Sequence, residues 1–488
     1  MRNFLTVLLA TAALFGAGQG GGAALAEVPS GAAAGGAPGP TMRADEAPTP
    51  LVQRAATLAA AEGRPAEALA LAEILLRRDP KDPLAHFIVA RIMAQTRQTG
   101  VARQAAAKAF RYAESPRQHY EAARLSAQIA LGENRMQAAQ YWARQTIQHA
   151  PDARYRAQGV NDYRRLRATN PLRWRLSLGL KPSNNVNGGA DERYNVIDGF
   201  DAVGILSDDA MALGGIIGTA SFGVDYRVAR SARSETSLGF TGYLKAVELW
   251  GDPVAEALVP PGVTPPPPRP IRNSDFSAAA FGLRGQHAMS LGKGASLSFA
   301  GELGQVWQGG EPSYRYQQIS ARGAMPVTQE APERPGISAS FGGLLEQRDY
   351  ASSAREDIRS SLDLGLRRGK VALGFGLSQT QSDSINARNW SVSANLRYEP
   401  DWTIGPMHMS LAAGASKTVY PYFVVVIFHP PGGRQDETIY GELGLWSPKI
   451  GTAGFSPEMK LRAVRTESNV SRYSNTEVSV ALGLRSTF

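Results

Sequence analysis

The stretch "PLRWRLSLGLK" at residues 171–181 contains an alternation that decides how the second half of the chain folds. Trp174 and the leucines around it share one parity, whereas Arg173, Arg175 and Lys181 share the other. Because successive side chains of a β-strand point to opposite faces, this pattern predicts a strand with one apolar and one charged face. The core of a soluble sheet would have to bury these cations, but a polar lumen accepts them. The pattern favours a strand of a membrane barrel.

Runs of the same kind recur to the end of the chain, among them "TASFGVDYRV", "KVALGFGLSQT" and the terminal "SVALGLRSTF". They amount to about 14 predicted strands in 171–488, each close to the roughly ten residues that cross an outer membrane when tilted. A closed barrel with an even number of strands leaves no unpaired edge in lipid. We therefore expect a transmembrane antiparallel β-barrel.

The connections between the predicted strands differ in length in a regular way. Long loops at 182–216, 247–274 and 416–436 follow the first, third and eleventh strands, whereas short turns such as "SLGKG", "RRGK" and "EPDW" follow even strands. The segment "AMPVTQEAPERP" is the one even connection of awkward length. Barrels of the outer membrane carry their long loops outside and their tight turns in the periplasm. This rule predicts a periplasmic C-terminus, where Phe488 resembles the assembly signal of such barrels.

The N-terminal residues predict export. Arg2 precedes the apolar run "FLTVLLATAALFGAG", and "ALA" follows at 24–26, so residues 1–26 are predicted to be a signal peptide cleaved after Ala26. The Pro- and Gly-rich residues 27–50 predict a flexible linker. The chain has no cysteine, which excludes N-terminal lipidation and disulfides.

Residues 51–170 are rich in Ala, Arg, Gln and Leu and predict helices. Pro80, Pro116 and Pro151 recur at similar spacing, each downstream of a glycine. Paired amphipathic helices with this period resemble tetratricopeptide repeats, as in "GRPAEALALAEILLRRDPKDPLAHFIVARIM". The complete architecture expected is a periplasmic tetratricopeptide-like domain at 51–170, followed by an outer-membrane β-barrel at 171–488. An ordinary helical bundle is the alternative for 51–170.

The charge of the chain is concentrated in the helical half. Residues 51–170 contain 19 Lys and Arg against 10 Asp and Glu, and the whole chain has a formal net charge of +9. Arg117, Arg124 and Arg135 are the candidate residues for contact with an acidic polypeptide client or lipid headgroups. A solvated basic face is the simpler interpretation. Export argues against nucleic acid as a partner.

No catalytic, metal or cofactor site is predicted. The histidines do not have metal-ligand spacing, and there is no GxSxG motif. Ser290 lies near His287, but at a predicted turn. The six histidines are His86, His119, His149, His287, His408 and His429.

The predicted inward positions carry both signs of charge. They include Arg173, Arg175, Asp225, Arg227, Lys245, Arg284, Glu302, Asp363 and Arg397. The alternatives left by the residues alone are an exopolysaccharide export porin, which also joins helical repeats to a barrel, and a simple diffusion porin. The apolar segment "TVYPYFVVVIFHPP" at 418–431 either contacts an emerging substrate, folds into the lumen, or extends the two adjacent strands.

At the junction, "NPLRWRLSLGLKPSNNVNGG" resembles the first barrel strand and Asn-rich turn of the surface lipoprotein assembly modulators, the Slam family. Ser183, Asn184, Asn185 and Asn187 carry the resemblance; the family places one asparagine after the serine, and this chain has two. The resemblance implies a translocon-like protein that promotes export or surface display of lipoproteins or related secreted proteins. Outer-membrane lipids, a client protein, the barrel-assembly machinery and periplasmic chaperones are the implied partners.

Overall fold

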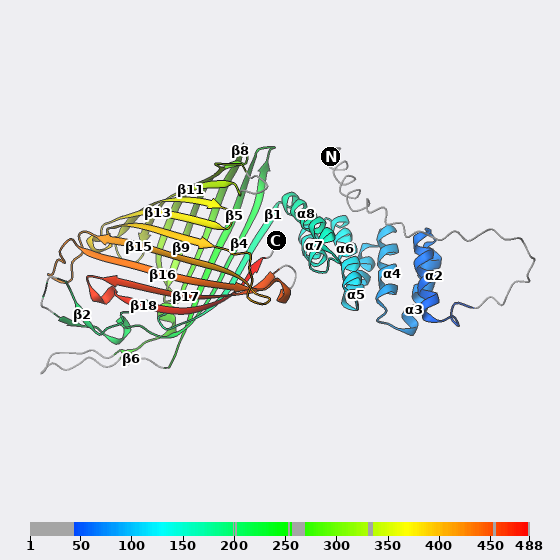
Figure 1. Cartoon of the computed structure of the whole chain (residues 1–488), viewed down its shortest axis with the longest axis horizontal. Coiled ribbons are helices and arrows are strands. Elements are labelled where there is room, and N and C mark those ends of the chain that lie inside the picture. The colour runs from blue at the N-terminus through cyan, green and yellow to red at the C-terminus, as the bar shows by residue number, and fades with distance from the viewer. Residues whose placement is uncertain are drawn as a thin grey trace, which may run out of the picture. The chain divides into compact units, whose positions relative to one another are not determined.

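The structure is a computed structural model of the 488-residue chain. It describes residues 43–198, 200, 203–251, 254–255, 269–329, 335–451 and 455–486. The predicted signal peptide, most of the predicted linker and Phe488 lie outside these residues. The chain divides into two units, Met1–Asn170 and Pro171–Phe488, at the point where the composition changes. Figure 1 shows helices in the first unit and strands in the second.

Seven helices are described in the first unit. They are α2 (Thr49–Ala61), α3 (Pro65–Arg78), α4 (Pro83–Gln95), α5 (Thr99–Arg111), α6 (Pro116–Gly132), α7 (Met136–Gln148) and α8 (Ala153–Thr169). Helices that are consecutive in the chain pack against one another. Whether they are tetratricopeptide repeats stays a prediction. Among the described residues, no helix is long and apolar enough to cross a membrane.

Local sequence signals account for where several helices begin. Ser115 forms a capping box with Gln118 at the start of α6, and Pro116 occupies the first helical position, where its missing N–H costs nothing. Asp82 and Asp152 accept hydrogen bonds from the first turns of α4 and α8. Small side chains then allow close packing. The fully covered alanines include Ala56, Ala59, Ala68, Ala72, Ala85, Ala102 and Ala106.

The second unit is a closed antiparallel barrel of fourteen strands, which confirms the predicted strand number. Each strand pairs with its neighbours in the chain, and β1 pairs with β18 to close the barrel (Figure 1). The strands are β1 (Leu172–Ser183), β4 (Gly215–Arg230), β5 (Ser234–Leu249), β8 (Ala278–Gly292), β9 (Ala295–Gln308), β10 (Glu311–Pro326), β11 (Ile337–Tyr350), β12 (Glu356–Arg368), β13 (Val371–Ser382), β14 (Asn389–Tyr398), β15 (His408–Tyr420), β16 (Arg434–Trp446), β17 (Phe455–Ser468) and β18 (Asn475–Ser486).

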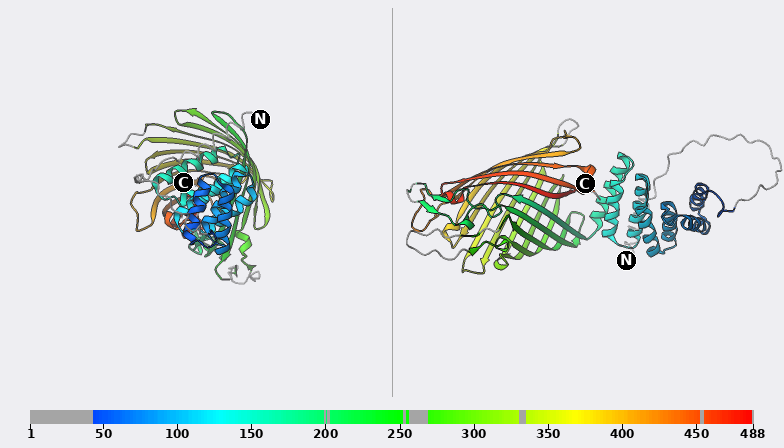
Figure 2. Two further views of the ribbon diagram at one scale, coloured as in Figure 1. Left: turned by 90° about the vertical axis from the view of Figure 1, so that its right-hand side faces the viewer. Right: turned by 90° about the horizontal axis from the view of Figure 1, so that it is seen from below.

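The outer face of the barrel is apolar. On β1, Trp174, Leu176, Leu178 and Leu180 are each more than half exposed. Comparable side chains lie on the other strands of the barrel, and Figure 2 shows the course of these strands from two further directions. They include Leu238, Leu283, Leu303, Ile319, Phe341, Leu345, Leu362, Leu364, Phe375, Leu377, Ile439, Leu482 and Leu484. Such a continuous apolar exterior is unfavourable in water and is what a bilayer requires.

The connections follow the expected asymmetry. The long ones, 184–214, 250–277 and 421–433, all join at the end of the barrel opposite to the start of β1, which we call the outer end. They include two small hairpins, β2 (Tyr194–Val196) with β3 (Val203–Ile205), and β6 (Val254–Ala255) with β7 (Arg269–Pro270). The expected short "EPDW" turn was wrong: 399–407 separates β14 from β15, because Ile404 and Met407 form a separate turn before β15 begins.

Candidate functional site in the barrel interior and at its closing strands

The strand register defines the inward face of the barrel. Arg173 lies opposite Asp225, and Asp225 lies opposite Gly239, while Trp174 and Val224 form the neighbouring outward pair. Because cross-strand partners share a face, the same face can be followed from strand to strand around the closed sheet. It contains all nine charged residues that the sequence predicts to point inward.

Most inward charges near β1 are paired. Arg175 lies 2.8 Å from Asp225, and Arg173 and Arg227 both contact Glu235, at 2.5 and 3.4 Å. Further around the wall Arg462 pairs with Glu442, and Arg485 lies between Glu399 and Glu458. Paired charges of both signs give a polar lumen without a strong field of either sign.

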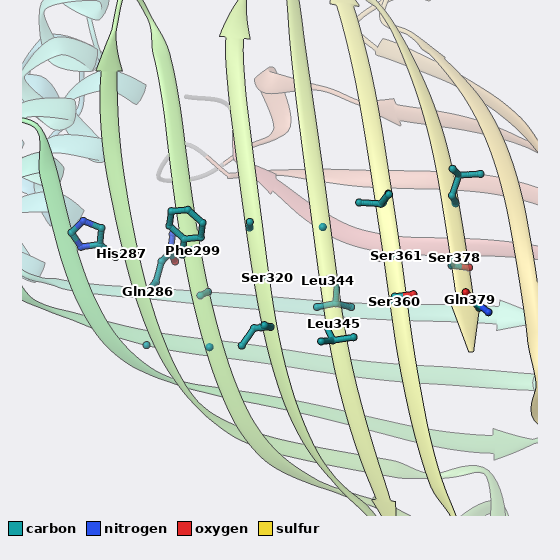
Figure 3. A pocket seen from close by; sticks show the side chains of 18 of the residues that line it. Gln286, His287, Phe299, Ser320, Leu344, Leu345, Ser360, Ser361, Ser378 and Gln379 are labelled. Atoms are coloured by element: carbon teal, nitrogen blue, oxygen red, sulfur yellow. The ribbon is translucent and has the colours of Figure 1, made fainter. Parts of the chain in front are cut away.

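The wall from β9 to β14 has a different interior. Here an inward row crosses the strands without a charge: Ala300, Ser320, Leu344, Ser361, Ser378 and Ser391. These residues line a groove together with the outward Phe299, Ile319, Leu345, Leu362, Leu377 and Trp390. Figure 3 shows Ser320, Leu344, Ser361 and Ser378 of this row on neighbouring strands. At the height of this row, the wall from β9 to β14 is therefore uncharged. The inward charges lie above and below the row and on the strands near β1.

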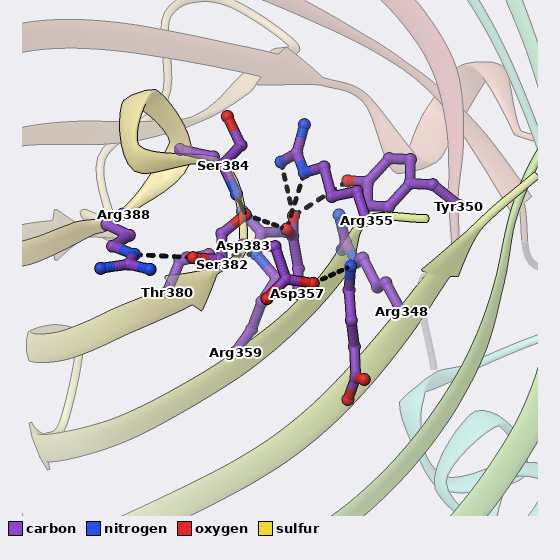
Figure 4. Close-up of polar contacts among 12 residues, drawn as sticks. Arg348, Tyr350, Arg355, Asp357, Arg359, Thr380, Ser382, Asp383, Ser384 and Arg388 are labelled. Carbon is purple, nitrogen blue, oxygen red and sulfur yellow. Dashed lines mark hydrogen bonds and ion pairs between the residues drawn. The ribbon is translucent and has the colours of Figure 1, made fainter. Parts of the chain in front are cut away.

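A carboxylate fixes the outer ends of β11 to β13. Asp357 is 3% exposed and accepts hydrogen bonds from Arg355 at 2.7 and 2.8 Å, from Ser382 at 2.5 Å and from Tyr350 at 3.1 Å. The Arg355 guanidinium also lies over the Tyr350 ring, 4.4 Å from its centroid. Figure 4 shows these side chains converging on Asp357. Three donors on one buried carboxylate make this part of the rim rigid.

The predicted motif after β1 lies where the barrel closes. Glu477 of β18 accepts hydrogen bonds from Ser183, at 3.0 Å, and from Lys181, at 2.6 Å. The side-chain amide of Asn184 binds the backbone of β18 as a neighbouring strand would. Its Oδ1 accepts from the Val478 N–H at 2.7 Å and its Nδ2 donates to the Thr476 carbonyl at 3.2 Å. Ser183 and Asn184 thus join β1 to β18 through side chains.

The other two asparagines of the motif fix the loop at 184–214. Asn185 exchanges two hydrogen bonds with the backbone of Gly189, both 2.9 Å long. Asn187 donates to the Met211 carbonyl at 2.7 Å and accepts from the Leu213 N–H at 3.0 Å. The motif therefore folds the long loop back on itself immediately beyond β1. Sequence reasoning identified these residues by family resemblance, without their contacts.

Apolar clusters cover the inner wall at the outer end. Val186 of the first long loop packs with Ile217 of β4, Val247 of β5 and Ile271 of the second long loop. A second cluster joins Ile197, Phe423 and Val470, which come from three different connections. The long loops are therefore packed against each other and against β4 and β5 at this end of the barrel, and we call these packed loops the folded cover.

The apolar segment at 418–431 contributes to the folded cover. β15 extends to Tyr420 and β16 begins at Arg434, so the two adjacent strands are extended as one alternative predicts. Phe423 is buried in the second cluster, among residues of other connections. Folding of the segment into the lumen stays a prediction. At the tip of the segment Val426 and Ile427 are 87% and 76% exposed. The Arg434 guanidinium lies between the Tyr420 and Tyr473 rings, 3.9 and 3.5 Å from their centroids.

The three candidate arginines of the helical unit have different surroundings. Arg117 is exposed on α6, and Arg124 lies two turns later on the same helix. Arg135, at the start of α7, pairs with Glu133, which also pairs with Arg103. Burial opposes ionisation of Glu133, but hydrogen bonds from Thr99 and Arg103 outweigh it and lower its pKa. Client contact by these arginines stays a prediction.

An aromatic cluster lies between α5, α6 and α7. Phe110 contacts the rings of His119, Trp142 and His149, at centroid distances of 5.0, 5.2 and 5.6 Å. The rings of His119 and His149 stack at 4.6 Å. Burial, followed by the charge of His119, lowers the pKa of His149. Two of the six histidines are thus part of a packed aromatic group between helices.

The residues considered for catalysis do not come together. His287 and Ser290 are both on β8, but His287 points outward and contacts Thr236, while Ser290 follows the opposite parity. Within the described ranges there is no group of three or more His, Cys, Asp or Glu that could hold a metal ion.

Comparisons with known proteins give only structural likeness. No protein-family model and no curated protein matches the chain. Among solved structures, it is similar to OccAB3 of Acinetobacter baumannii, at 9% identity over 64% of this chain and 98% of that one, with a TM-score of 0.32. A BenF-like porin from Pseudomonas fluorescens Pf-5 has 12% identity over 64% and 98%, with a TM-score of 0.31. OprD of Pseudomonas aeruginosa has 9% identity over 64% and 94%, with a TM-score of 0.30.

Proposed function

We propose that the chain is an outer-membrane, translocon-like protein that promotes the export or surface display of lipoproteins or related secreted proteins. The membrane assignment is supported by the closed sheet, whose backbone groups are paired from strand to strand, and by its apolar exterior. The outer end, with the long loops, faces the outside of the cell.

The helical unit belongs in the periplasm under this assignment. Only Asn170 and Pro171 separate the end of α8 from the start of β1. Because β1 begins at the end of the barrel that carries the short turns, the chain enters the barrel from the periplasmic side. A helical unit in this position meets an exported protein before the barrel does. Its exposed basic residues, such as Arg117, support contact with an acidic client.

The folded cover at the outer end carries the proposal. A diffusion porin works through a water-filled mouth, but here Val186, Ile217, Val247 and Ile271 bury apolar surface against one another at the mouth. Under this proposal the packed loops move when a client leaves the barrel. That behaviour suits a protein that acts on specific clients, and it argues against steady diffusion of small solutes.

The proposal is tested by removing the gene and restoring it. The reporter is the lipoprotein or small secreted protein encoded next to the gene, and its display is measured by protease accessibility on intact cells. We expect display to fall at least tenfold without the protein and the client to accumulate in the periplasm. Unchanged display would contradict the proposal.

The exopolysaccharide exporter gives a different result in the same cells. Loss of extracellular glycan with normal client display would favour it. A chain lacking 51–165 separates the two roles further, because the strands that form the barrel remain. We expect this variant to insert in the outer membrane but to leave the client in the periplasm.

A further inference from the structure

The contact that closes the barrel is shorter than the other strand contacts. Among the described residues, β1 and β18 are in register at Gly179 with Gly483, Leu180 with Leu482, and Ser183 with Ser479. On its other side, β1 is in register with β4 continuously from Leu172 to Ser183. We call the β1–β18 contact the seam.

A proline interrupts the seam. Asn184 donates its backbone N–H to the Val478 carbonyl, at 3.4 Å, so even-numbered residues of β1 direct their backbone groups toward β18. Pro182 is the next residue of this parity and has no N–H to donate. Proline inside a sheet is characteristic of edge strands. β1 is therefore an edge-like strand on the side where it meets β18.

The seam has few cross-strand pairs in register. Gly179 faces Gly483, so this pair has no side chains to contact each other, while Leu180 faces Leu482 on the outward side and Ser183 faces Ser479 on the inward side. By contrast, the β12–β13 contact is in register without interruption from Asp357 to Arg368. The seam therefore lacks the continuous pairing that holds β12 and β13 together.

What holds the seam is a group of side-chain contacts at its outer part. Glu477 binds Lys181 and Ser183, and the Asn184 side-chain amide adds two hydrogen bonds to β18 beyond Pro182. We call these four residues the clasp. The loop beyond the clasp also contacts the start of β18 and the β17–β18 connection, since Asp191 accepts from the Thr476 N–H of β18 and Ile197 bridges Val470 of the connection. The barrel is closed at this point by individual side-chain contacts, and each of them can break without the others.

We propose that the seam is a lateral gate through which the acyl anchor of a lipoprotein client passes, so that the chain acts on acylated polypeptides. This inference rests on the function proposed above and names its substrate class. The lumen beside the seam is charged, with Arg175, Asp225, Lys181 and Glu477 on its inward face. Acyl chains are excluded from such a lumen by the hydrophobic effect. An opening between β1 and β18 lets the anchor stay in lipid while the polypeptide crosses.

A disulfide across the seam tests the gate, because the native chain has no cysteine. Ser183→Cys with Ser479→Cys joins an inward pair that lies directly opposite across the seam. Ser393→Cys with Ser416→Cys is the matched control, an inward pair of serines opposite each other on β14 and β15. Leu180→Cys with Leu482→Cys is a second seam lock on the outward face, which leaves the clasp intact.

The readout is surface display of the acylated client and of the same client with its acylated cysteine replaced. When oxidised, either seam lock should lower display of the acylated client at least tenfold, and reduction should restore it. The control disulfide should leave display unchanged, and the unacylated client should cross under all conditions. Full display with an oxidised seam overturns the gate.

Two further outcomes distinguish failure of the acyl-anchor gate from failure of the proposed function. Loss of both clients on locking overturns the assignment to the acyl anchor. If the reduced, folded protein does not promote display of either client, the proposed function itself is wrong. Heat modifiability on gels verifies that each variant forms the barrel before display is measured.

Discussion

The seam between β1 and β18 and the contact between β12 and β13 are both antiparallel contacts in one barrel, but they are held together differently. β12 and β13 are paired at every position from their tight turn to Asp357, whose carboxylate then fixes the rim. The seam has a proline, two facing glycines and a carboxylate that binds across it. The comparison teaches that strand contacts with the same antiparallel topology can differ, within one barrel, in how firmly they hold the two strands together.

The difference follows from which groups make the closure. Backbone hydrogen bonds in a continuous ladder support one another, because the strand geometry positions neighbouring donors and acceptors together. Side-chain contacts such as those of Asn184 and Glu477 can be lost without moving the rest of the strand. The seam is thus suited to open locally, and β12 and β13 are suited to stay together.

The largest effect is expected on the strong side of the comparison. Asp357→Ala removes a buried carboxylate that binds Arg355, Ser382 and Tyr350. We expect the free energy of unfolding to fall by about 3 kcal/mol, because the donors lose their partner. Urea unfolding of the protein in lipid vesicles measures it. Asp363→Ala, on the same strand and face but exposed, is the control and should have little effect.

A smaller loss is expected at the seam. Glu477→Ala removes the acceptor for Lys181 and Ser183 and should lower the free energy of unfolding by about 1–2 kcal/mol. The same variant should make a disulfide between positions 180 and 482 easier to reduce, since the strands separate more often. A loss as large as that of Asp357→Ala would remove the contrast between the two contacts.

The smallest effect on stability is expected from repairing the seam. Pro182→Ala supplies the missing N–H, worth about 1 kcal/mol, but it frees the unfolded chain by a similar amount. Stability should therefore change little, while client display should fall severalfold because the seam opens less often. Pro457→Ala, in β17, is the control, because Pro457 faces β18 from the side opposite to the seam. Normal display by Pro182→Ala would mean that the interruption is incidental.

The alternation of residues predicted much of the barrel. The strand number, the inward charges and the position of the long loops follow from periods of two residues and from turn lengths, which are local properties. The Asn184–Val478 contact joins residues 294 positions apart in the chain, and it can be found only once the closing strands are in register. The hydrogen bonds of Asp357 could not be predicted from the sequence either, because their donors come from three separate elements.

In the helical unit, too, some features could be predicted from the sequence and others depend on the fold. Pro80, Pro116 and Pro151, which lie at or just before the starts of α4, α6 and α8, were recognised in the sequence, whereas the capping box of Ser115 with Gln118 emerges from the structure. The net positive charge was also clear, but the pairing of Arg103 with Glu133 depends on how α5 packs against the end of α6. Charge composition therefore predicted a basic surface without identifying which arginines are available on it.

The most direct test of the central claim, that the seam is the part of the wall that opens, is a distance measurement between spin labels. Labels at Leu178 and Leu484 lie on the outward face of β1 and β18 and are next to the Gly179–Gly483 pair. Labels at Leu362 and Leu377, which are opposite each other on β12 and β13, report the strong contact. With the acylated client present, we predict a second, longer distance at the seam and one unchanged distance at the control. A single unchanged distance at both pairs would contradict the account.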